Sequence, residues 1–188
     1  RVLFRSAGYQ DLMELNLVTN TEVRQSMIDL GADPDRIEVC YTGIDAEEMA
    51  AAARQRNATR AMFDIPDAMP VLAFAGRMTE QKRPLLLAEI LHELAHRGIP
   101  FYAFVVGDGH LRPDLEQRIR KYRLGPSVHL AGTLDHGQWL ELLGAAEIFL
   151  LPSLYEGISI ALSEAMGLGV VPVVSAVGGQ AEIGRAHV

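Results

Sequence analysis

The sequence predicts an α/β fold in which a parallel sheet carries helices on both faces. From residue 71 onward, five short and almost continuously apolar runs alternate with segments of helical length. Strands of a parallel sheet are buried on both faces, so they lack the polar side that an exposed sheet would show. The intervening segments are amphipathic, as expected of helices that cover a sheet. Glycine or proline separates many of these segments, which indicates that the chain turns between them.

The first 45 residues predict a strand, a helix and a second strand. Residues 15–19 read as a strand end, and Asn20 or Thr21 can cap the helix that follows. Gly31 ends this helix, and a proline-containing turn leads to a strand at 37–41.

From residue 46 the expected elements alternate regularly. An Ala- and Arg-rich segment, residues 46–61, predicts an exposed helix that leads into a proline-containing loop at 65–70. The expected strands are residues 71–75, 101–106, 128–131, 148–151 and 170–174. The expected helices are about residues 80–97, 111–123, 137–146 and 158–166.

Composition limits the classes of function. The chain has 188 residues, of which 49% are hydrophobic and 22% charged, and this balance is typical of a globular domain. A net charge of −7 argues against general nucleic-acid binding and against anionic membranes. Cys40 is the single cysteine, so no disulfide can form within the chain. No apolar run approaches the roughly 18 residues of a membrane span, and no signal peptide is visible, so we expect a cytoplasmic protein.

The last strand-helix-strand unit holds the most distinctive pattern. Residues 148–183 read IFLLPSLYEGISIALSEAMGLGVVPVVSAVGGQAEI. Ligands of open parallel sheets bind at the carboxyl ends of the strands, and Glu156 stands in that loop. Glu164 follows eight positions later, about two turns into the helix and roughly 80° away around its axis. We therefore expect the two carboxylates to touch different parts of one elongated ligand.

This unit resembles the Glu-x7-Glu signature of retaining glycosyltransferases with the GT-B architecture, and of family 4 in particular. That architecture has two Rossmann-like domains. The segment EGISIALSEAMGLG is similar to the family pattern E-G-F-P-x-x-x-x-E-A-M/A-x-x-G, with Ile158 and Ser159 at the usual Phe and Pro. The segment VTNTEVRQSMIDLGADPDRIEVCYTGID resembles the crossing from the first domain to the second. The resemblance implies that residues 1–45 are a remnant of the N-terminal domain and its crossing. It makes residues 46–188 the nucleotide-sugar-binding Rossmann-like domain, truncated at its C-terminus.

Both ends of the chain predict a fragment of a longer protein. The chain does not begin with Met, and neither RVLFRS at its start nor GRAHV at its end fits the adjoining pattern. We expect extraneous sequence at both ends and little or no activity from this piece alone.

The segment AFAGRMTEQKRP directly follows the first strand of the sheet. Gly76 lets the backbone turn close to a ligand. Arg77 can bind phosphate oxygens through two N–H groups, and Lys82 supplies a point charge. The segment resembles the family's G-R-x-x-x-x-K, whose Arg and Lys hold the donor diphosphate. The alternative is an ordinary solvated helix start, which loses weight beside the motif at 156–164.

Two further loops follow strands of the sheet. Gly107 and Gly109 do not form a GxGxxG fingerprint, because position 112 is arginine, and we expect a tight turn without direct ligand contact. The loop at Thr133 and Leu134 lies along the nucleotide base in the resembling family, mostly through backbone atoms. A plain loop is the alternative there.

Two features of the sequence each allow two interpretations. The amides of Gly178 and Gly179 could hold an anion ahead of a helix start, and a required tight turn is equally compatible with their positions. Trp139 stands at helical spacing with Leu142 and Leu143, so we expect it in the core rather than as a stacking platform.

Two short motifs suggest metals that we do not expect. His92 and His96 belong to HELAH, which matches the zinc pattern HExxH, and Glu116 could complete a ligand set. Both histidines stand opposite the apolar stripe of their helix and should face solvent. Residues 33–35 read DPD, like the DxD of metal-dependent sugar transferases, but they fall in a turn. We predict no metal site.

The resemblance implies transfer of a sugar from a nucleoside diphosphate sugar to an acceptor, with retention of anomeric configuration and without a cofactor. Arg77 and Lys82 would stabilise the diphosphate leaving group. Glu164 would accept hydrogen bonds from the ribose, and Glu156 from the transferred sugar. Backbone amides of three residues would approach the sugar and phosphate: Gly157, Ile158 and Ser159.

The resemblance also implies where the other substrate binds. The acceptor, a glycan, lipid or small molecule, would bind mainly to the N-terminal domain. A peripheral position of the longer protein at the inner membrane face stays open. The alternative function is a noncatalytic nucleotide- or sugar-binding module of the same fold, and a zinc hydrolase is a third hypothesis. The presence of Arg77, Lys82, Glu156 and Glu164 favours the enzyme.

Overall fold

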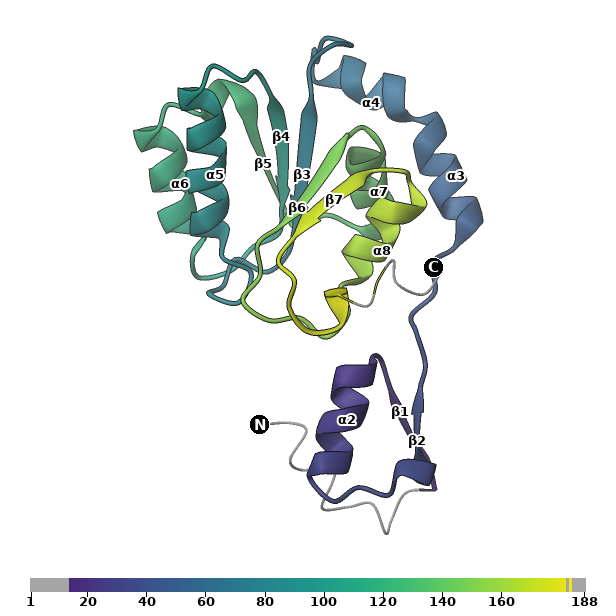
Figure 1. Cartoon of the computed structure of the whole chain (residues 1–188). Coiled ribbons are helices and arrows are strands. Elements are labelled where there is room, and N and C mark those ends of the chain that lie inside the picture. Colours follow the sequence, from purple (N-terminus) through teal and green to yellow (C-terminus); the bar gives the residue numbers. More distant parts are fainter. Residues whose placement is uncertain (1–13, 182, 184–188) are drawn as a thin grey trace. The chain divides into compact units, whose positions relative to one another are not determined.

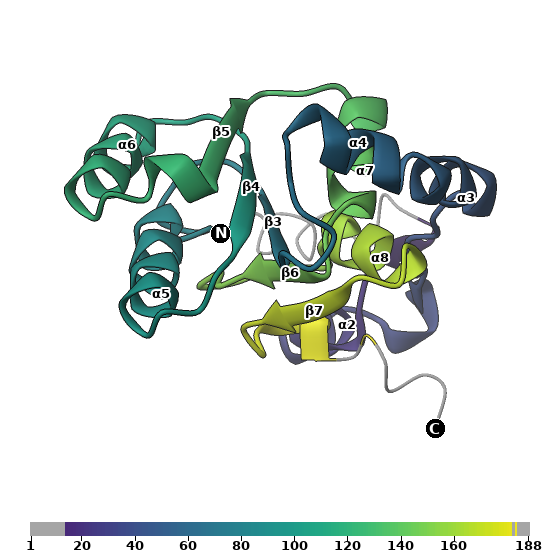
Figure 2. The same ribbon diagram turned by 90° about the horizontal axis from the view of Figure 1, so that it is seen from above.

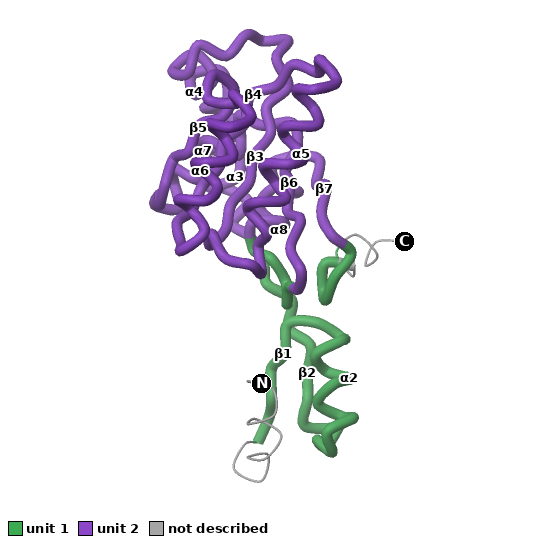
Figure 3. The backbone as a smooth tube through the Cα atoms, turned by 90° about the vertical axis from the view of Figure 1, so that its left-hand side faces the viewer, with its two compact units in different colours: residues 1–43, 156–160, 176–188 green, residues 44–155, 161–175 purple. Residues whose placement is uncertain are grey.

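A parallel sheet organises the larger of two compact units in the computed structural model, which describes residues 14–181 and 183 (Figure 1). One unit comprises residues 1–43, 156–160 and 176–188, and the other comprises residues 44–155 and 161–175 (Figure 3). The segments RVLFRS and GRAHV, predicted to be extraneous sequence, lie outside the described residues. Each unit is described by itself.

Within the described residues, five parallel strands of the larger unit pair in the order β5-β4-β3-β6-β7. Their bounds are β3 Val71–Ala75, β4 Tyr102–Val106, β5 Val128–Gly132, β6 Ile148–Leu151 and β7 Val171–Val174. The apolar runs therefore predicted every strand of this sheet to within one residue at either end. Its central strands bury their side chains on both faces, and Phe74, Phe104 and Phe149 are each at most 1% exposed.

Helices cover both faces of this sheet, as predicted. Helix α5, Pro84–His96, packs with α6, Arg112–Lys121, on one face (Figure 2). On the other face lie α7, His136–Gly144, and α8, Ile160–Gly167 (Figure 2). Helix α5 begins four residues later than the predicted start at 80, because Arg83 adopts a left-handed conformation (φ 52°) and Pro84 takes the first helical position.

The predicted exposed helix at 46–61 is corrected by the structure. It is two helices, α3 Ala46–Arg54 and α4 Arg56–Met62, which meet at Gln55. Both pack against α7, and their buried residues are Met49, Ala52, Thr59 and Arg60. On α4 no apolar stripe indicated this packing, because its buried residues, Thr59 and Arg60, are polar.

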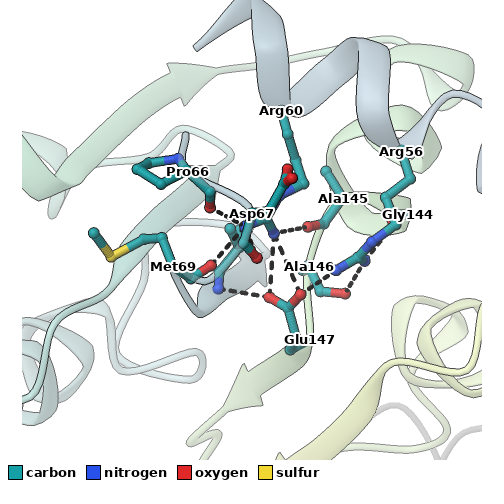
Figure 4. Close-up of polar contacts among 10 residues, drawn as sticks. Arg56, Arg60, Pro66, Asp67, Met69, Gly144, Ala145, Ala146 and Glu147 are labelled. Carbon is teal, nitrogen blue, oxygen red and sulfur yellow. Dashed lines mark hydrogen bonds and ion pairs between the residues drawn. The ribbon is translucent and has the colours of Figure 1, made fainter. Parts of the chain in front are cut away.

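A polar network ties α4 to the sheet at the amino ends of β3 and β6 (Figure 4). Arg60, whose side chain is 4% exposed, lies 3.3 Å from Glu147, which also pairs with Arg56. Glu147 accepts a 2.7 Å hydrogen bond from the backbone N–H of Val71. Arg60 also donates to four carbonyl oxygens, those of Pro66, Asp67, Met69 and Ala145. This network fixes the amino ends of these strands, at the end of the sheet opposite the carboxyl ends.

The smaller unit contains a parallel strand pair joined by a helix. Strand β1, Asn16–Val18, pairs with β2, Ile37–Val39, and α2, Thr21–Asp29, connects them. Its core consists of the buried residues Val18, Met27, Ala32 and Ile37. Asn20 caps α2, because its side-chain oxygen accepts a 2.7 Å hydrogen bond from the N–H of Val23. The predicted strand, helix and strand are confirmed here.

Candidate functional site

The sheet has one point at which the direction of its strand order reverses. The chain builds outward from β3 through β4 to β5, and then returns to the other side of β3 with β6 and β7. Ligands of open α/β sheets bind beyond the carboxyl ends of the strands at such a reversal. The loop after β3 holds Gly76, Arg77 and Lys82, and the loop after β6 leads toward Glu156. Most of the predicted site residues therefore follow the strands that border the reversal.

The loop after β3 is compact and folds over its own glycine. A Cβ atom at Gly76 would lie 3.1 Å from side-chain carbons of Lys82, so the lysine stem crosses the space that glycine leaves. Arg77 is exposed. Arg83 and Pro84 start α5 without a side-chain cap, and this helix start lies at the same loop. The two cationic side chains and the positive end of a helix dipole are thus contributed by one short segment.

Backbone hydrogen bonds join this loop to the one after β6. The N–H of Leu154 donates to the carbonyl of Gln81 at 2.8 Å, and the Gln81 side chain donates to the carbonyl of Tyr155 at 3.0 Å. Tyr155 directly precedes Glu156 in the sequence. The two loops that border the strand reversal are therefore held together up to the residue before the first predicted carboxylate.

The glycine pair after β4 packs directly under the loop that carries Arg77. Gly107 has a φ of 126°, and a Cβ on it would lie 2.0 Å from the carbonyl oxygen of Gly76. A Cβ on Gly109, whose φ is 152°, would lie 2.6 Å from the carbonyl oxygen of Met78. Only glycine permits this approach, so the predicted tight turn is confirmed. The close packing of this glycine pair supports the backbone of the loop that carries Arg77.

An ion pair bridges the same two loops at the surface. His110 Nε2 lies 3.0 Å from Glu80 Oε1, and this hydrogen bond lowers the pKa of the Glu80 carboxyl below its ordinary value. Both side chains are more than half exposed, so solvent weakens the attraction between them.

The loop after β5 is held by its neighbours on both sides. Gly132 accepts a 2.7 Å hydrogen bond from the N–H of Gly107, which joins this loop to the glycine pair. Thr133 is exposed and Leu134 is half-buried. Asp135 and Gln138 then form a capping box at the start of α7. The predicted base-binding residues therefore stand between two fixed points of the backbone.

Glu164 is buried on α8, and both of its carboxylate oxygens accept hydrogen bonds from α7. Glu164 Oε1 lies 2.7 Å from His136 Nε2, and Oε2 lies 2.7 Å from the indole nitrogen of Trp139. Trp139 is 7% exposed, which confirms its predicted place in the core. The hydrogen bond to Glu164 raises the pKa of His136 above its ordinary value. Sequence reasoning did not identify His136, and the neighbouring Asp135 cap was the one local signal that α7 begins there.

The segment that carries Glu156 belongs to the smaller unit, where glycines pack tightly against it. A Cβ on Gly178, whose φ is 55°, would lie 1.8 Å from the carbonyl oxygen of Glu156. The N–H of Gly179 donates to the carbonyl of Gly157 at 2.9 Å, and Asn20 Nδ2 donates to the same oxygen at 3.2 Å. The predicted tight turn at this glycine pair is confirmed. Ser159 is buried, and Glu156 and Ile158 are half-buried.

The short motifs that suggested metals have other partners. His96 is exposed as predicted, whereas His92 stacks on Tyr122 with ring centroids 4.1 Å apart. Glu116 instead pairs with Arg112. Asp33 caps a 3-10 turn at Pro34–Arg36, which confirms the turn reading of DPD. Among residues 14–181, no group of three or more His, Cys, Asp or Glu side chains is placed to hold a metal ion.

Known proteins resemble this chain in sequence. A sequence model of the family described as Glycosyl transferases group 1 matches residues 55–188. UDP-Gal:alpha-D-GlcNAc-diphosphoundecaprenol alpha-1,3-galactosyltransferase of Escherichia coli is 32% identical over 157 residues, covering 80% of this chain and 39% of that protein. D-inositol 3-phosphate glycosyltransferase of Kineococcus radiotolerans is 33% identical over 188 residues, covering 93% of this chain and 43% of that protein. The chain thus spans less than half the length of either relative.

Solved structures agree on the fold. WaaG, a glycosyltransferase involved in lipopolysaccharide biosynthesis, superposes with a TM-score of 0.78 at 22% identity, covering 90% of this chain and 46% of that one. Anabaena Alr3699/HepE, solved in complex with UDP and glucose, gives a TM-score of 0.78 at 19% identity, covering 96% and 50%. The predicted α/β architecture is confirmed by these similarities. Within the described part of the chain, every helix is too short or too polar to cross a bilayer.

Proposed function

Because this chain belongs to the group 1 glycosyltransferases, we propose that it supplies the donor-binding domain of a retaining enzyme of the family 4 type. That enzyme would move a sugar from a nucleoside diphosphate sugar to an acceptor. The observation that carries the proposal is the gathering of Gly76, Arg77 and Lys82 in the loop beside the strand reversal. This is where a ligand of such a sheet binds.

Arg77 and Lys82 are proposed to hold the donor diphosphate. In the transfer, the bond between the sugar and the diphosphate oxygen breaks, and the diphosphate leaves with the electron pair. Cationic side chains and a helix N-terminus placed at that oxygen stabilise the developing charge. These groups allow departure without a metal ion or a cofactor, and we include metal independence in the proposal.

The two carboxylates are assigned to different parts of the donor. Glu164 is proposed to accept hydrogen bonds from the ribose, and its fixed orientation supports this role. Glu156 is proposed to bind hydroxyls of the transferred sugar, with backbone amides of Gly157 to Ser159 beside it. Thr133 and Leu134 would lie along the base through their backbone. The solved HepE complex makes UDP the first nucleotide to test.

The acceptor is proposed to bind mainly to a part of the longer protein that precedes residues 1–45. The relatives are more than twice as long as the segment that this chain matches, which supports such a division of labour. The acceptor would be a glycan, a lipid or a small molecule. A cytoplasmic location, with the longer protein at most peripheral to the membrane, is part of the same proposal.

Calorimetric titration of the chain with UDP, GDP and ADP tests the donor site. We expect one of them to bind, and we expect Arg77→Ala to weaken that binding by about tenfold, as loss of a charge-assisted hydrogen bond implies. Arg120→Ala is the matched control, because Arg120 is exposed on α6. EDTA should leave the affinity unchanged.

Two results would count against this function. Equal affinity in the Arg77→Ala chain would remove the diphosphate assignment. Absence of binding to all three nucleotides, in the folded chain and in the longer protein alike, would favour a noncatalytic member of the family.

A further inference from the structure

The Glu164 carboxylate is fixed more firmly than a ligand-binding carboxylate on an open loop would be. Its side chain is 6% exposed, and it accepts one hydrogen bond on each oxygen, from His136 and from Trp139. Burial of a carboxylate is unfavourable unless its oxygens are hydrogen-bonded. The two hydrogen-bond donors on α7 therefore allow Glu164 to be buried. They also fix the orientation of its carboxylate plane.

The two donors differ in their surroundings. Trp139 is buried and contributes mainly to the core, where its ring packs near Phe149. The His136 side chain is 56% exposed, so little apolar burial explains its presence. Its second ring nitrogen, Nδ1, lies 3.6 Å from Glu48 of α3. A largely exposed ring that reaches a buried carboxylate at 2.7 Å is better explained by orientation than by packing.

We propose that His136 is a positioning residue that turns the Glu164 carboxylate toward the ribose of a bound nucleoside diphosphate. The inference rests on the proposed function, which assigns the ribose to Glu164. A carboxylate offers about four lone-pair sites. One on each oxygen is used by α7, which leaves one on each oxygen for the two neighbouring hydroxyls of a ribose. The resulting preference for ribose over deoxyribose is the property that His136 sets.

The charges around His136 predict how pH changes this arrangement. The groups that face it are Glu164 on α8, Glu48 on α3 and Asp135 at the start of its own helix. The arginines of α4, Arg56 and Arg60, are paired with Glu147 instead. β4, which also packs against α7, contributes mainly apolar side chains.

Protonated His136 donates a charge-assisted hydrogen bond from Nε2 to Glu164 and carries a positive charge 3.6 Å from the Glu48 carboxylate, whereas the neutral ring can make only the weaker, uncharged hydrogen bond. Because the hydrogen bond to Glu164 raises the pKa of His136, the charged ring persists above the ordinary range of histidine. Its charge is lost as the pH rises through that raised value. Nucleotide affinity should therefore fall on the alkaline side of neutrality.

The test compares ribonucleotide and 2′-deoxyribonucleotide binding. The ligand is whichever of UDP, GDP and ADP the unaltered chain binds, titrated at several pH values between about 6 and 9 around the ordinary histidine range. His136→Ala should weaken ribonucleotide binding roughly tenfold, as one lost hydrogen bond to a charged group implies, and should leave deoxyribonucleotide binding less affected. His136→Gln can still donate but cannot be charged, so it should restore part of the affinity and remove the pH dependence. His96→Gln, an exposed histidine on α5, is the matched control.

A Glu164→Gln variant separates this inference from the proposed function. If Glu164→Gln reduces the ribose preference and His136→Ala does not, His136 has no positioning role and the inference is overturned. If neither variant changes the preference for ribose, the assignment of the ribose to Glu164 is rejected together with the positioning role of His136. If neither the folded chain nor the longer protein binds any of the three nucleotides, both ideas are rejected. Circular dichroism of each variant confirms that altered binding does not reflect unfolding.

Discussion

At the scale of single residues, Arg60 is a buried charge with an unusually complete set of partners. Its guanidinium pairs with Glu147 and donates to four carbonyl oxygens from two segments of the chain. Removing the Arg60 side chain would take the donor from all four carbonyl oxygens at once. We therefore expect stability to depend strongly on this network, although it lies at the amino ends of the strands, opposite the proposed donor site.

Arg60→Ala is expected to lower the free energy of unfolding by about 3 kcal/mol, because its ion pair with Glu147 and the hydrogen bonds of its buried guanidinium to four carbonyl oxygens are lost together. Arg120→Ala should change it by less than about 0.5 kcal/mol, since the exposed pair of Arg120 with Glu116 is long, at 3.9 Å. Chemical denaturation of the two variants measures the difference. Equal stability of the two variants would mean that water takes the place of the Arg60 guanidinium and satisfies its partners.

Single residues were predictable where their role depends on the local sequence. Asn20 as a cap and Trp139 as a core residue follow from their immediate neighbours, and the structure confirms both. His136 and Arg60 were not predictable. Each acts through a partner at least 28 residues away, and neither position carries a pattern that names that partner. The ligand roles of Arg77, Lys82 and Glu156 came from a family resemblance and stay predictions.

At the scale of elements, the loops after β3 and β4 form one packed layer. Gly107 has no room for a Cβ, whereas Gly98, also at positive φ, has no atom within 4 Å of that position. The two glycines therefore separate conformational strain from steric overlap.

Gly98→Ala is expected to cost about 1 kcal/mol of stability, the strain of a left-handed residue. Gly107→Ala should cost about 3 kcal/mol or more, because the methyl group would overlap the carbonyl of Gly76. It should also weaken nucleotide binding, since that carbonyl belongs to the loop of Arg77. Thermal unfolding and calorimetry measure the two effects. Similar costs at both glycines would contradict the overlap.

Asn20 joins two elements of the smaller unit by using both ends of its amide. Its oxygen caps α2, and its nitrogen donates to the carbonyl of Gly157, one residue beyond Glu156. Asn20→Ser keeps a cap and loses the second hydrogen bond, so about 1 kcal/mol of stability should be lost. Asn20→Ala loses both, for about 2 kcal/mol. Asn57→Ala, at an exposed position on α4, serves as the control in denaturant titrations. A serine variant as unstable as the alanine variant would assign the effect to the Gly157 contact alone.

Elements were predictable in proportion to their apolar content. The central strands β3, β4 and β6 are short apolar runs that are buried on both faces, so their type and limits follow from the sequence. Segment 46–61 was correctly predicted to be helical, but the break at Gln55 and the packing against α7 were missed, because two of its four buried residues, Thr59 and Arg60, are polar. Its contact with α7 depends on Gly144, where a Cβ would come within 3.1 Å of the Ala52 carbonyl. No local pattern reports such a contact between distant helices.

At the scale of the whole molecule, the larger unit holds a five-stranded sheet with a reversal site, and the chain spans less than half the length of the curated relatives that it matches. Alternation of apolar runs and helical segments predicted the class of this architecture. The strand order did not follow from the sequence, because adjacency of β3 and β6 is a property of packing. The proposed division between residues 1–45 and 46–188 stays a prediction.

We expect the chain to bind a nucleoside diphosphate without transferring a sugar, because the proposed acceptor site belongs to the longer protein. Chromatographic analysis of a nucleoside diphosphate sugar incubated with the chain, and with the longer protein plus candidate acceptors, tests this expectation. Transfer by the 188-residue chain alone would place the acceptor site within it.

The place of β6 in the sheet also determines when the larger unit can be completed during synthesis. Leu72 of β3 pairs with Ile148 of β6, a partner 76 positions later in the chain. Closing such a long loop is slow compared with forming a neighbouring hairpin or helix. Until residue 151 has left the ribosome, one side of β3 remains an unpaired apolar edge, which other nascent chains can join. The arrangement that opens a binding site therefore also leaves this protein exposed to aggregation while it is being made.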